Sequence, residues 1–369
     1  MDRIRELVKQ IPGSVYTVRQ LRKCLPQFGG HHLQDGEWLY QREVIEWLCN
    51  NRSARKQLPL LYRIFGAYCA HRHRSGGERI TGGREIHRSI ISLRKALRLK
   101  DNAHVTIDSK TIFLDLHDPR MLQVPNEISD SYPDTAILRS FIGSQDTFVD
   151  VGANHGSFSV AASKVIGSEG LIVAIEPQPR KADLVKKSLA ANAECEFQVH
   201  NIACADETSE VDFFIPTGSS GGASMFSEYA AVVRHQKIRV SVRRFDEATA
   251  WKSFPGQVFV KVDVEGSESK FLNGASEMIR NRRPEIMLEV NQLSMTAAGE
   301  SKGNLIGQLK ALGYSRYYDV RPFSGPFALA NLLTTARRDV RNIIVTARDA
   351  LLTIPLFMVH AKAVLDLLE

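Results

Sequence analysis

The chain has 369 residues, of which 43% are hydrophobic and 24% charged; this is an ordinary composition for a soluble globular protein, in a chain longer than one compact domain usually is. A charged start without an apolar signal core, and apolar runs far short of the about 20 residues that span a bilayer, argue against secretion and membrane insertion, so we expect a cytoplasmic protein. Five scattered cysteines without a C-x-x-C pair favour reduced thiols over a disulfide framework or a zinc site.

The net charge of +7 comes entirely from the first third of the chain. Residues 1–130 carry 22 Lys and Arg against 14 Asp and Glu, whereas the remainder is nearly neutral. Apolar residues at three- and four-residue spacing predict mostly helical structure in residues 1–100, and the alternating stretch 105–116 predicts a β-hairpin. We favour a solvated helical face that docks on the rest of the chain for the basic segment 84–100, with polyanion binding as the alternative.

A strand, a glycine turn and a helix are predicted over residues 147–165. The apolar run 148–151 indicates a buried strand, and helix-compatible apolar spacing resumes from Phe158. Between them, Gly152 and Gly156 let the backbone turn sharply and approach a ligand, because neither has a Cβ. This is the opening unit of a nucleotide-binding α/β sheet.

Asp150 indicates which of two cofactors, a dinucleotide or S-adenosylmethionine (SAM), such a loop binds. It ends the strand two positions before Gly152, so we expect its carboxylate to point into the ligand crevice. There it repels the pyrophosphate of a dinucleotide and attracts the ammonium and sulfonium groups of SAM. The loop also departs from the G-x-G-x-x-G spacing, so SAM rather than NAD is the expected cofactor.

Three later strands end in polar residues that fit this ligand. The apolar run 171–175 precedes Glu176, which we expect to accept hydrogen bonds from the ribose hydroxyls. Asn201 follows a third strand and has two interpretations of equal weight, a contact with the adenine base and a role in the turn. A fourth strand begins at Val258 and ends in clustered carboxylates.

The ordered motifs D-V-G-A-N-x-G at 150–156, E-P at 176–177 and V-K-V-D-V-E-G-S-E at 260–268 resemble the FkbM family of class I SAM-dependent methyltransferases. The resemblance spans residues 134–346. It implies an α/β, Rossmann-like sheet with strand order 3-2-1-4-5-7-6 and a β-hairpin before the catalytic domain. The mainly helical N-terminal extension lies outside the resemblance and is predicted from its apolar spacing alone.

We place the methyltransferase domain at residues 131–346. Within it, the glycine loop with Gly152, Asn154 and Gly156 is expected to bind the cofactor, and a helix over 134–141 is expected to lie over the cleft as a lid. The small, polar stretch 218–227 is expected to form a mobile loop near the substrate.

Methyl transfer from a sulfonium is an in-line displacement, so an enzyme must align the reactants and take up the proton of the nucleophile. We expect Asp263 to face cofactor and substrate, and Lys261, two residues earlier, to reach the same face. For Glu265 two interpretations stay open, a general base and a residue that starts the following helix. The chain has no His pair at ligand spacing, so we favour a metal-independent site, with a divalent metal shared by Asp263 and nearby carboxylates as the alternative. His155, at the variable position of the loop, is interpreted as incidental.

The favoured function is SAM-dependent O-methylation of a hydroxyl on a sugar, a glycan precursor or another small molecule. The alternatives are an RNA methyltransferase that uses the basic N-terminal region, disfavoured because no RNA-binding signature is present, and a non-catalytic SAM-binding scaffold. The apolar segment 347–369 predicts a helical tail that packs on the body or on a second subunit, as in a homo-oligomer, with peripheral membrane contact as the alternative.

Overall fold

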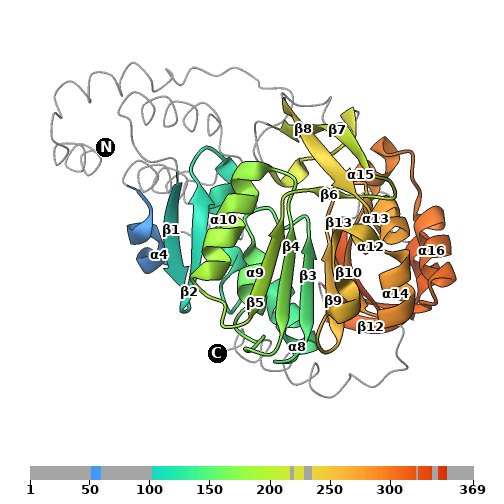
Figure 1. The fold of residues 1–369 in the computed structure, drawn as a ribbon, viewed down its shortest axis with the longest axis horizontal. Helices are drawn as coiled ribbons and strands as arrows, with labels where there is room; N and C mark the ends of the chain where they lie inside the picture. The colour runs from blue at the N-terminus through green and yellow to red at the C-terminus, as the bar shows by residue number, and fades with distance from the viewer. Residues whose placement is uncertain are drawn as a thin grey trace.

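The computed structural model describes residues 51–59, 102–216, 220–227, 235–320, 323–334 and 340–346. The helices expected before residue 51 and over residues 60–101, and the apolar tail 347–369, lie outside these ranges. In the part that is described, the expected α/β fold is confirmed: helices cover both faces of a large, mostly parallel sheet (Figure 1). No helix of the described residues is both long and apolar enough to cross a membrane.

The main sheet has eight strands. In sheet order they are β12 (Phe323–Ala328), β11 (Arg316–Val320), β13 (Val340–Thr346), β10 (Glu285–Asn291), β9 (Val258–Val262), β3 (Thr147–Val151), β4 (Leu171–Ile175) and β5 (Glu196–His200). The strands from β10 to β5 run parallel, and β13 joins β10 antiparallel. With β12 set aside and the other seven numbered along the chain, the order reads 3-2-1-4-5-7-6; β12 is an additional edge strand that the sequence did not predict.

The two faces of the sheet follow from the alternation of side chains along each strand. In β3, Phe148 packs on one face, whereas Val149 and Val151 pack on the other. The Phe148 face is covered by α8 (Pro133–Phe141), α9 (Ser157–Ala162) and α10 (Pro179–Ala190), and the opposite face by α13 (Glu268–Gly274), α14 (Ser276–Arg282) and α16 (Lys302–Ala311). The helix expected over 134–141 is therefore a fixed part of the body, because Ile137 and Leu138 of α8 lie in the same core as Phe148.

The predicted hairpin is confirmed as β1 (Asn102–Ile107) and β2 (Lys110–Asp115), which lie beside α10 (Figure 1). Side-chain amides cover both of its edges. Gln57, at the end of α4 (Arg52–Gln57), bonds both the N–H and the C=O of Thr106 on β1, at 2.7 and 2.8 Å. Asn192 bonds both backbone groups of Thr111 on β2, at 2.9 and 2.5 Å.

The two added strands expected after the third strand of the main sheet are also confirmed. They are β7 (Ser209–Pro216) and β8 (His235–Arg243), which form a separate small sheet with the two-residue strand β6 (Ala203–Cys204) in the order β6-β8-β7. The short helix η2 (Ser220–Gly222) follows β7. The remaining short elements are η1 (Pro119–Leu122), α7 (Val124–Glu127), α12 (Phe245–Ala248), η3 (Trp251–Ser253), α15 (Gln292–Ala297) and η4 (Leu329–Thr334).

Candidate active site

A cavity of about 330 Å³ opens at the carboxyl ends of the parallel strands. It lies where β3 has β4 on one side and β9 on the other, the point at which the strand order reverses and at which open α/β sheets bind ligands. Of the described residues that line the cavity, six are acidic and two are cationic, namely Glu127, Asp134, Glu176, Asp263, Glu265 and Glu289 against Arg120 and Lys261. The cavity therefore favours a ligand with net positive charge.

The glycine loop contributes its backbone to the cavity floor. Gly152 has φ 78°, and a Cβ added there would come within 1.9 Å of the carbonyl oxygen of Asp263. Gly156 has φ 83°, and Asn154 between them is also left-handed, with φ 52°. The sharp turn inferred from the two glycines is thus present, and at Gly152 it also permits the close approach of the segment after β9.

Glu176 lies at the tip of β4 with its carboxylate at the cavity. Its Oε2 accepts the backbone N–H of Asn154 at 2.7 Å and its Oε1 accepts that of Gln178 at 2.9 Å. Burial raises the pKa of Glu176 to about 7, although the two backbone hydrogen bonds oppose this shift. Each oxygen has a further lone pair, so the carboxylate can also accept hydroxyl donors from a ligand.

Asp150 is not where we expected it. Its carboxylate is fully buried beneath α9, where Oδ2 accepts the Ser159 hydroxyl at 2.6 Å and the Ser159 N–H at 3.1 Å, and it does not line the cavity. Alternation is the reason: Asp150 is two residues from Phe148 and shares its face. Burial raises the pKa of Asp150, opposed by the charge of Lys261.

Lys261 is the direct partner of Asp150 on the neighbouring strand. Its Nζ lies 3.8 Å from Asp150 Oδ1 and 3.2 Å from Asp263 Oδ2, so the expectation that Lys261 and Asp263 share a face agrees with the structure. Burial lowers the pKa of Lys261, but the charges of Asp263 and Asp150 outweigh it and the net shift is upward. Lys261 is therefore a buried ammonium held between two carboxylates.

Asn201 takes the turn role. Its Nδ2 donates to the carbonyl oxygens of Glu176 and Pro177 at 2.9 and 3.0 Å, and it does not line the cavity. The wall after β5 is made instead by Ile202, Ala203 and Cys204, which suit the flat face of a base. Burial raises the pKa of the Cys204 thiol to about 12, and this cysteine is unpaired, in keeping with the reduced thiols expected.

Three carboxylates gather opposite the glycine loop. Ligand oxygens of Asp263, Glu265 and Glu289 lie within 4.8 Å of one another, a spacing that could hold a metal ion. Burial raises the pKa of Glu289 well above its ordinary value, and the charges of Asp263 and Glu265 add to the shift. Within the part of the chain that the structure describes, one of the Glu289 oxygens has no hydrogen-bond partner. Glu289 therefore has a strong tendency to take up a proton.

Glu265 faces the cavity rather than the following helix. It adopts a left-handed conformation, with φ 48°, and its Oε2 accepts from Asn291 at 3.4 Å. The backbone of the turn is bonded instead by Glu268, whose carboxylate accepts the N–H groups of Val264 and Gly266. Of the two interpretations of Glu265, this geometry favours the reactive one.

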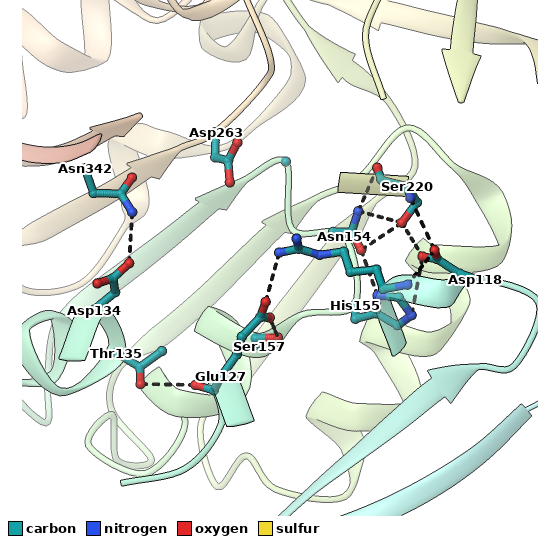
Figure 2. A network of polar contacts seen from close by, with 12 residues as sticks. Asp118, Glu127, Asp134, Thr135, Asn154, His155, Ser157, Ser220, Asp263 and Asn342 are labelled. Carbon is teal, nitrogen blue, oxygen red and sulfur yellow. Dashed lines mark hydrogen bonds and ion pairs between the residues drawn. The ribbon is translucent and has the colours of Figure 1, made fainter. Parts of the chain in front are cut away.

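A buried polar network fixes the glycine loop from below (Figure 2). His155, which we had interpreted as incidental, lies at its centre: Nδ1 is 2.7 Å from the Asn154 Oδ1, and Nε2 accepts from Lys181 at 2.7 Å. Burial lowers the pKa of His155 well below its usual range, and the charge of Lys181 lowers it further, so the ring is neutral with its proton on Nδ1. Lys181 also pairs with Asp118 at 2.5 Å.

The same network reaches the short helix over the cavity. Ser220 of η2 donates its hydroxyl to Asp118, and Asn154 donates to the Ser220 carbonyl and hydroxyl at 3.2 and 3.0 Å (Figure 2). The Asn154 side chain thus binds Ser220, while its backbone N–H donates to the Glu176 carboxylate. The described part of the stretch expected to be a mobile loop, residues 220–227, is anchored at its first residue.

Residues before the glycine loop supply one wall of the cavity; the sequence placed the helix from Asp134 there, but not Arg120 or Glu127. Arg120 follows the η1 cap, and its Nη2 lies 3.1 Å from Oε1 of Glu127 at the end of α7. Oε2 of Glu127 accepts the Ser157 hydroxyl at 2.6 Å (Figure 2). Asp134, in the first turn of α8, accepts from Asn342 of β13 at 3.0 Å. This wall therefore joins the segment before β3 to the far side of the sheet.

Residues 150–316 match the model of the methyltransferase FkbM domain, and no curated protein matches the chain. Among solved structures, similarity extends to the FkbM methyltransferase of Methylobacillus flagellatus KT, with 16% identity over 61% of this chain and 53% of that one, at a TM-score of 0.33. It extends also to M. jannaschii TYW2 in complex with AdoMet, with 12% identity over 67% of this chain and 84% of that one, at a TM-score of 0.35. A SAM-dependent O-methyltransferase of Thermotoga maritima is similar with 10% identity over 70% of this chain and 82% of that one, at a TM-score of 0.32. The chain spans about half the length of the first of these structures.

Proposed function

We propose that the methyltransferase FkbM domain carried by residues 150–316 transfers the methyl group of SAM to a hydroxyl of a small acceptor, such as a sugar or a glycan precursor. The observation that supports this proposal most is the position of Asp263, Glu265 and Glu289 in one cavity with the glycine loop and Glu176. A nucleotide-binding half and a proton-accepting half thereby face each other across a space of small-molecule size.

The residues of the nucleotide-binding half fit SAM. Glu176 accepts the ribose hydroxyls, as its remaining lone pairs permit, and the apolar wall at Ile202 and Cys204 contacts the base. The excess of acidic residues around the cavity stabilises a ligand that carries a sulfonium. Bound SAM supplies a methyl group on a positively charged sulfur, which is the electrophile of the reaction.

The carboxylates of the other half hold the acceptor and take up its proton. A hydroxyl is a weak nucleophile until its proton leaves, and a carboxylate with a raised pKa is a stronger proton acceptor than an ordinary carboxylate. Glu289 has this property, and Glu265 is its neighbour at the cavity. Asp263, paired with Lys261 at 3.2 Å, lies beside the reacting groups and orients the acceptor. The oxygen–carbon bond then forms as the sulfur–carbon bond breaks.

The same carboxylates argue against the other candidate functions. A polyanion such as RNA meets repulsion at a wall with six acidic and two cationic residues, so a neutral hydroxyl acceptor fits better. A scaffold that only binds SAM has no need of three clustered carboxylates opposite the glycine loop, one of which, Glu289, has a raised pKa.

Transfer of a labelled methyl group to a panel of hydroxylated sugars and glycan precursors tests the proposal. We expect E289Q and D263N to lose at least about 100-fold in kcat, the usual contribution of acid–base catalysis, while binding of S-adenosylhomocysteine (SAH) stays within a few fold of wild type. E196Q, at an exposed carboxylate on β5, is the matched control and should behave as wild type. Absence of SAH binding, or labelling of RNA in place of every hydroxylated acceptor, would contradict the proposal.

A further inference from the structure

One cation at the cavity has no assigned role. Of the two that line it in the described residues, Lys261 is already held by Asp263 and Asp150. Arg120 is paired with Glu127 through Nη2, whereas its Nε is buried without a hydrogen-bond partner. A guanidinium has five N–H donors in a planar fork, so Arg120 keeps donors for a ligand.

The partner of Arg120 is an equally suitable acceptor. Glu127 is 6% exposed, and each of its oxygens has one donor, Arg120 on Oε1 and the Ser157 hydroxyl on Oε2. A carboxylate has about four lone-pair sites, so Glu127 can also accept an ammonium. Ser157 directly follows Gly156, which places this pair next to the glycine loop. Arg120 has unused hydrogen-bond donors and Glu127 has unused acceptor sites, so the pair is complementary to a zwitterionic ligand.

We propose that Arg120 and Glu127 form a clamp for the amino-acid end of the cofactor, in which Arg120 binds the α-carboxylate and Glu127 the α-ammonium. This inference rests on the proposed function, and it gives the ammonium a partner in place of the buried Asp150. It also gives a role to a segment that precedes the matched domain, since both residues come before residue 150. Residues 118–134 are then part of the cofactor site.

The position of the clamp is supported from both sides. Asp118 accepts the backbone N–H of Arg120 at 3.0 Å and is itself held by Lys181 and Ser220, so the start of η1 is fixed to the network under the glycine loop. On the other side, the charge of Asp263 stabilises the Arg120 guanidinium and, with Glu127, raises its pKa. Arg120 thus lies between the glycine loop and the end of β9.

Calorimetric titration with two ligands tests the clamp. SAH has the amino-acid end, and 5′-methylthioadenosine has the same adenosine and sulfur without it. Hydrogen bonds between charged groups contribute about 1.5–3 kcal/mol, so wild type should bind SAH at least about tenfold more tightly than methylthioadenosine. In R120Q and E127Q this ratio should fall by about tenfold through weaker SAH binding alone. R139Q, which removes an arginine that pairs with Asp130 away from the cavity, is the matched control and should leave the ratio unchanged.

The outcomes separate the clamp from the function on which it rests. If wild type binds neither ligand, the proposed function fails. If wild type prefers SAH and R120Q keeps that preference, the clamp is wrong while the function stands; a raised KM for the acceptor in R120Q would then assign Arg120 to an anionic group of the acceptor. If R120Q does not fold, R120K keeps the charge without the fork, and an unchanged ratio in both R120K and E127Q would overturn the proposal.

Discussion

The contact between Gly152 and the segment after β9 predicts a large effect of one methyl group. A Cβ at residue 152 would lie 1.9 Å from the carbonyl oxygen of Asp263, whereas contacts of real Cβ atoms are essentially never shorter than 3.0 Å, so in G152A the two backbones must separate by about 1 Å. The Asp263 carbonyl cannot simply rotate away, because it shares a peptide plane with the N–H of Val264, which donates to the Glu268 carboxylate at 3.2 Å. Strain of this kind costs about 1–3 kcal/mol, and the left-handed conformation of alanine adds about 1–2 kcal/mol.

G156A is the matched control for this prediction. It has the same left-handed strain, with φ 83°, but its Cβ would meet the Val185 side chain at 3.2 Å instead of a backbone carbonyl at 1.9 Å, so the neighbour has to move by only a few tenths of an ångström. Urea unfolding should therefore show G152A to be less stable than G156A by about 1–3 kcal/mol. Since a shift of about 1 Å at a reacting group costs about 100-fold in rate, G152A should also lose that much kcat. Equal stability of the two variants, with undiminished activity in G152A, would refute the close approach.

Three further predictions concern charge. Because the pKa of Glu176 is raised from 4.5 to about 7, the folded state binds its proton more tightly than the unfolded state, and the free energy of unfolding falls as pH rises through this window. In urea unfolding from pH 4 to 8, E176Q should reduce this fall by at most ~3 kcal/mol. An unchanged pH dependence in E176Q would contradict the raised pKa. D118N should lower the free energy of unfolding, measured by thermal unfolding, by about 3 kcal/mol, because it leaves the Lys181 ammonium buried without its main partner. The double variant D118N/K181M should recover part of this loss, and a loss below about 1 kcal/mol in D118N would show the pair to be unimportant. Methyl transfer should survive dialysis against EDTA, because Lys261 already supplies positive charge next to Asp263; a loss of activity restored by Mg²⁺ would instead assign a metal to the three cavity carboxylates.

The fold was accessible from the sequence because buried parallel strands leave a strong pattern. Each of the segments 147–151, 171–175 and 258–262 is fully buried in the structure. The second is an unbroken apolar run before Glu176, and the other two remain recognisable because each has four apolar or β-branched residues around one charged residue, Asp150 or Lys261. The edge strand β12 lacks such a run, since its sequence, FSGPFA, contains a glycine and a proline. Strands of this kind cannot be read from hydrophobic patterning alone.

The site was predictable where side-chain alternation governs it and not elsewhere. Counting from Phe148 would have placed Asp150 under the helix, and the same count along β10 from Met287 would have placed Glu289 on the face of Lys261. Arg120 and Glu127 left no such signal. They lie in irregular chain with one-turn helices, whose side-chain directions depend on contacts far along the sequence.

The amides on the two edges of the hairpin have a consequence for the behaviour of the protein in solution. A hairpin exposes backbone donors and acceptors on both outer edges, and another molecule can add a strand there and begin aggregation. Thr106 and Thr111 are direct partners across the hairpin, so Gln57 and Asn192 cover the same row from opposite sides. Each side-chain amide makes the two hydrogen bonds that the backbone of a neighbouring strand would make, but it offers no further strand edge. At this row the outer edge of each strand is already bonded within the molecule, so a second chain cannot pair with Thr106 or Thr111.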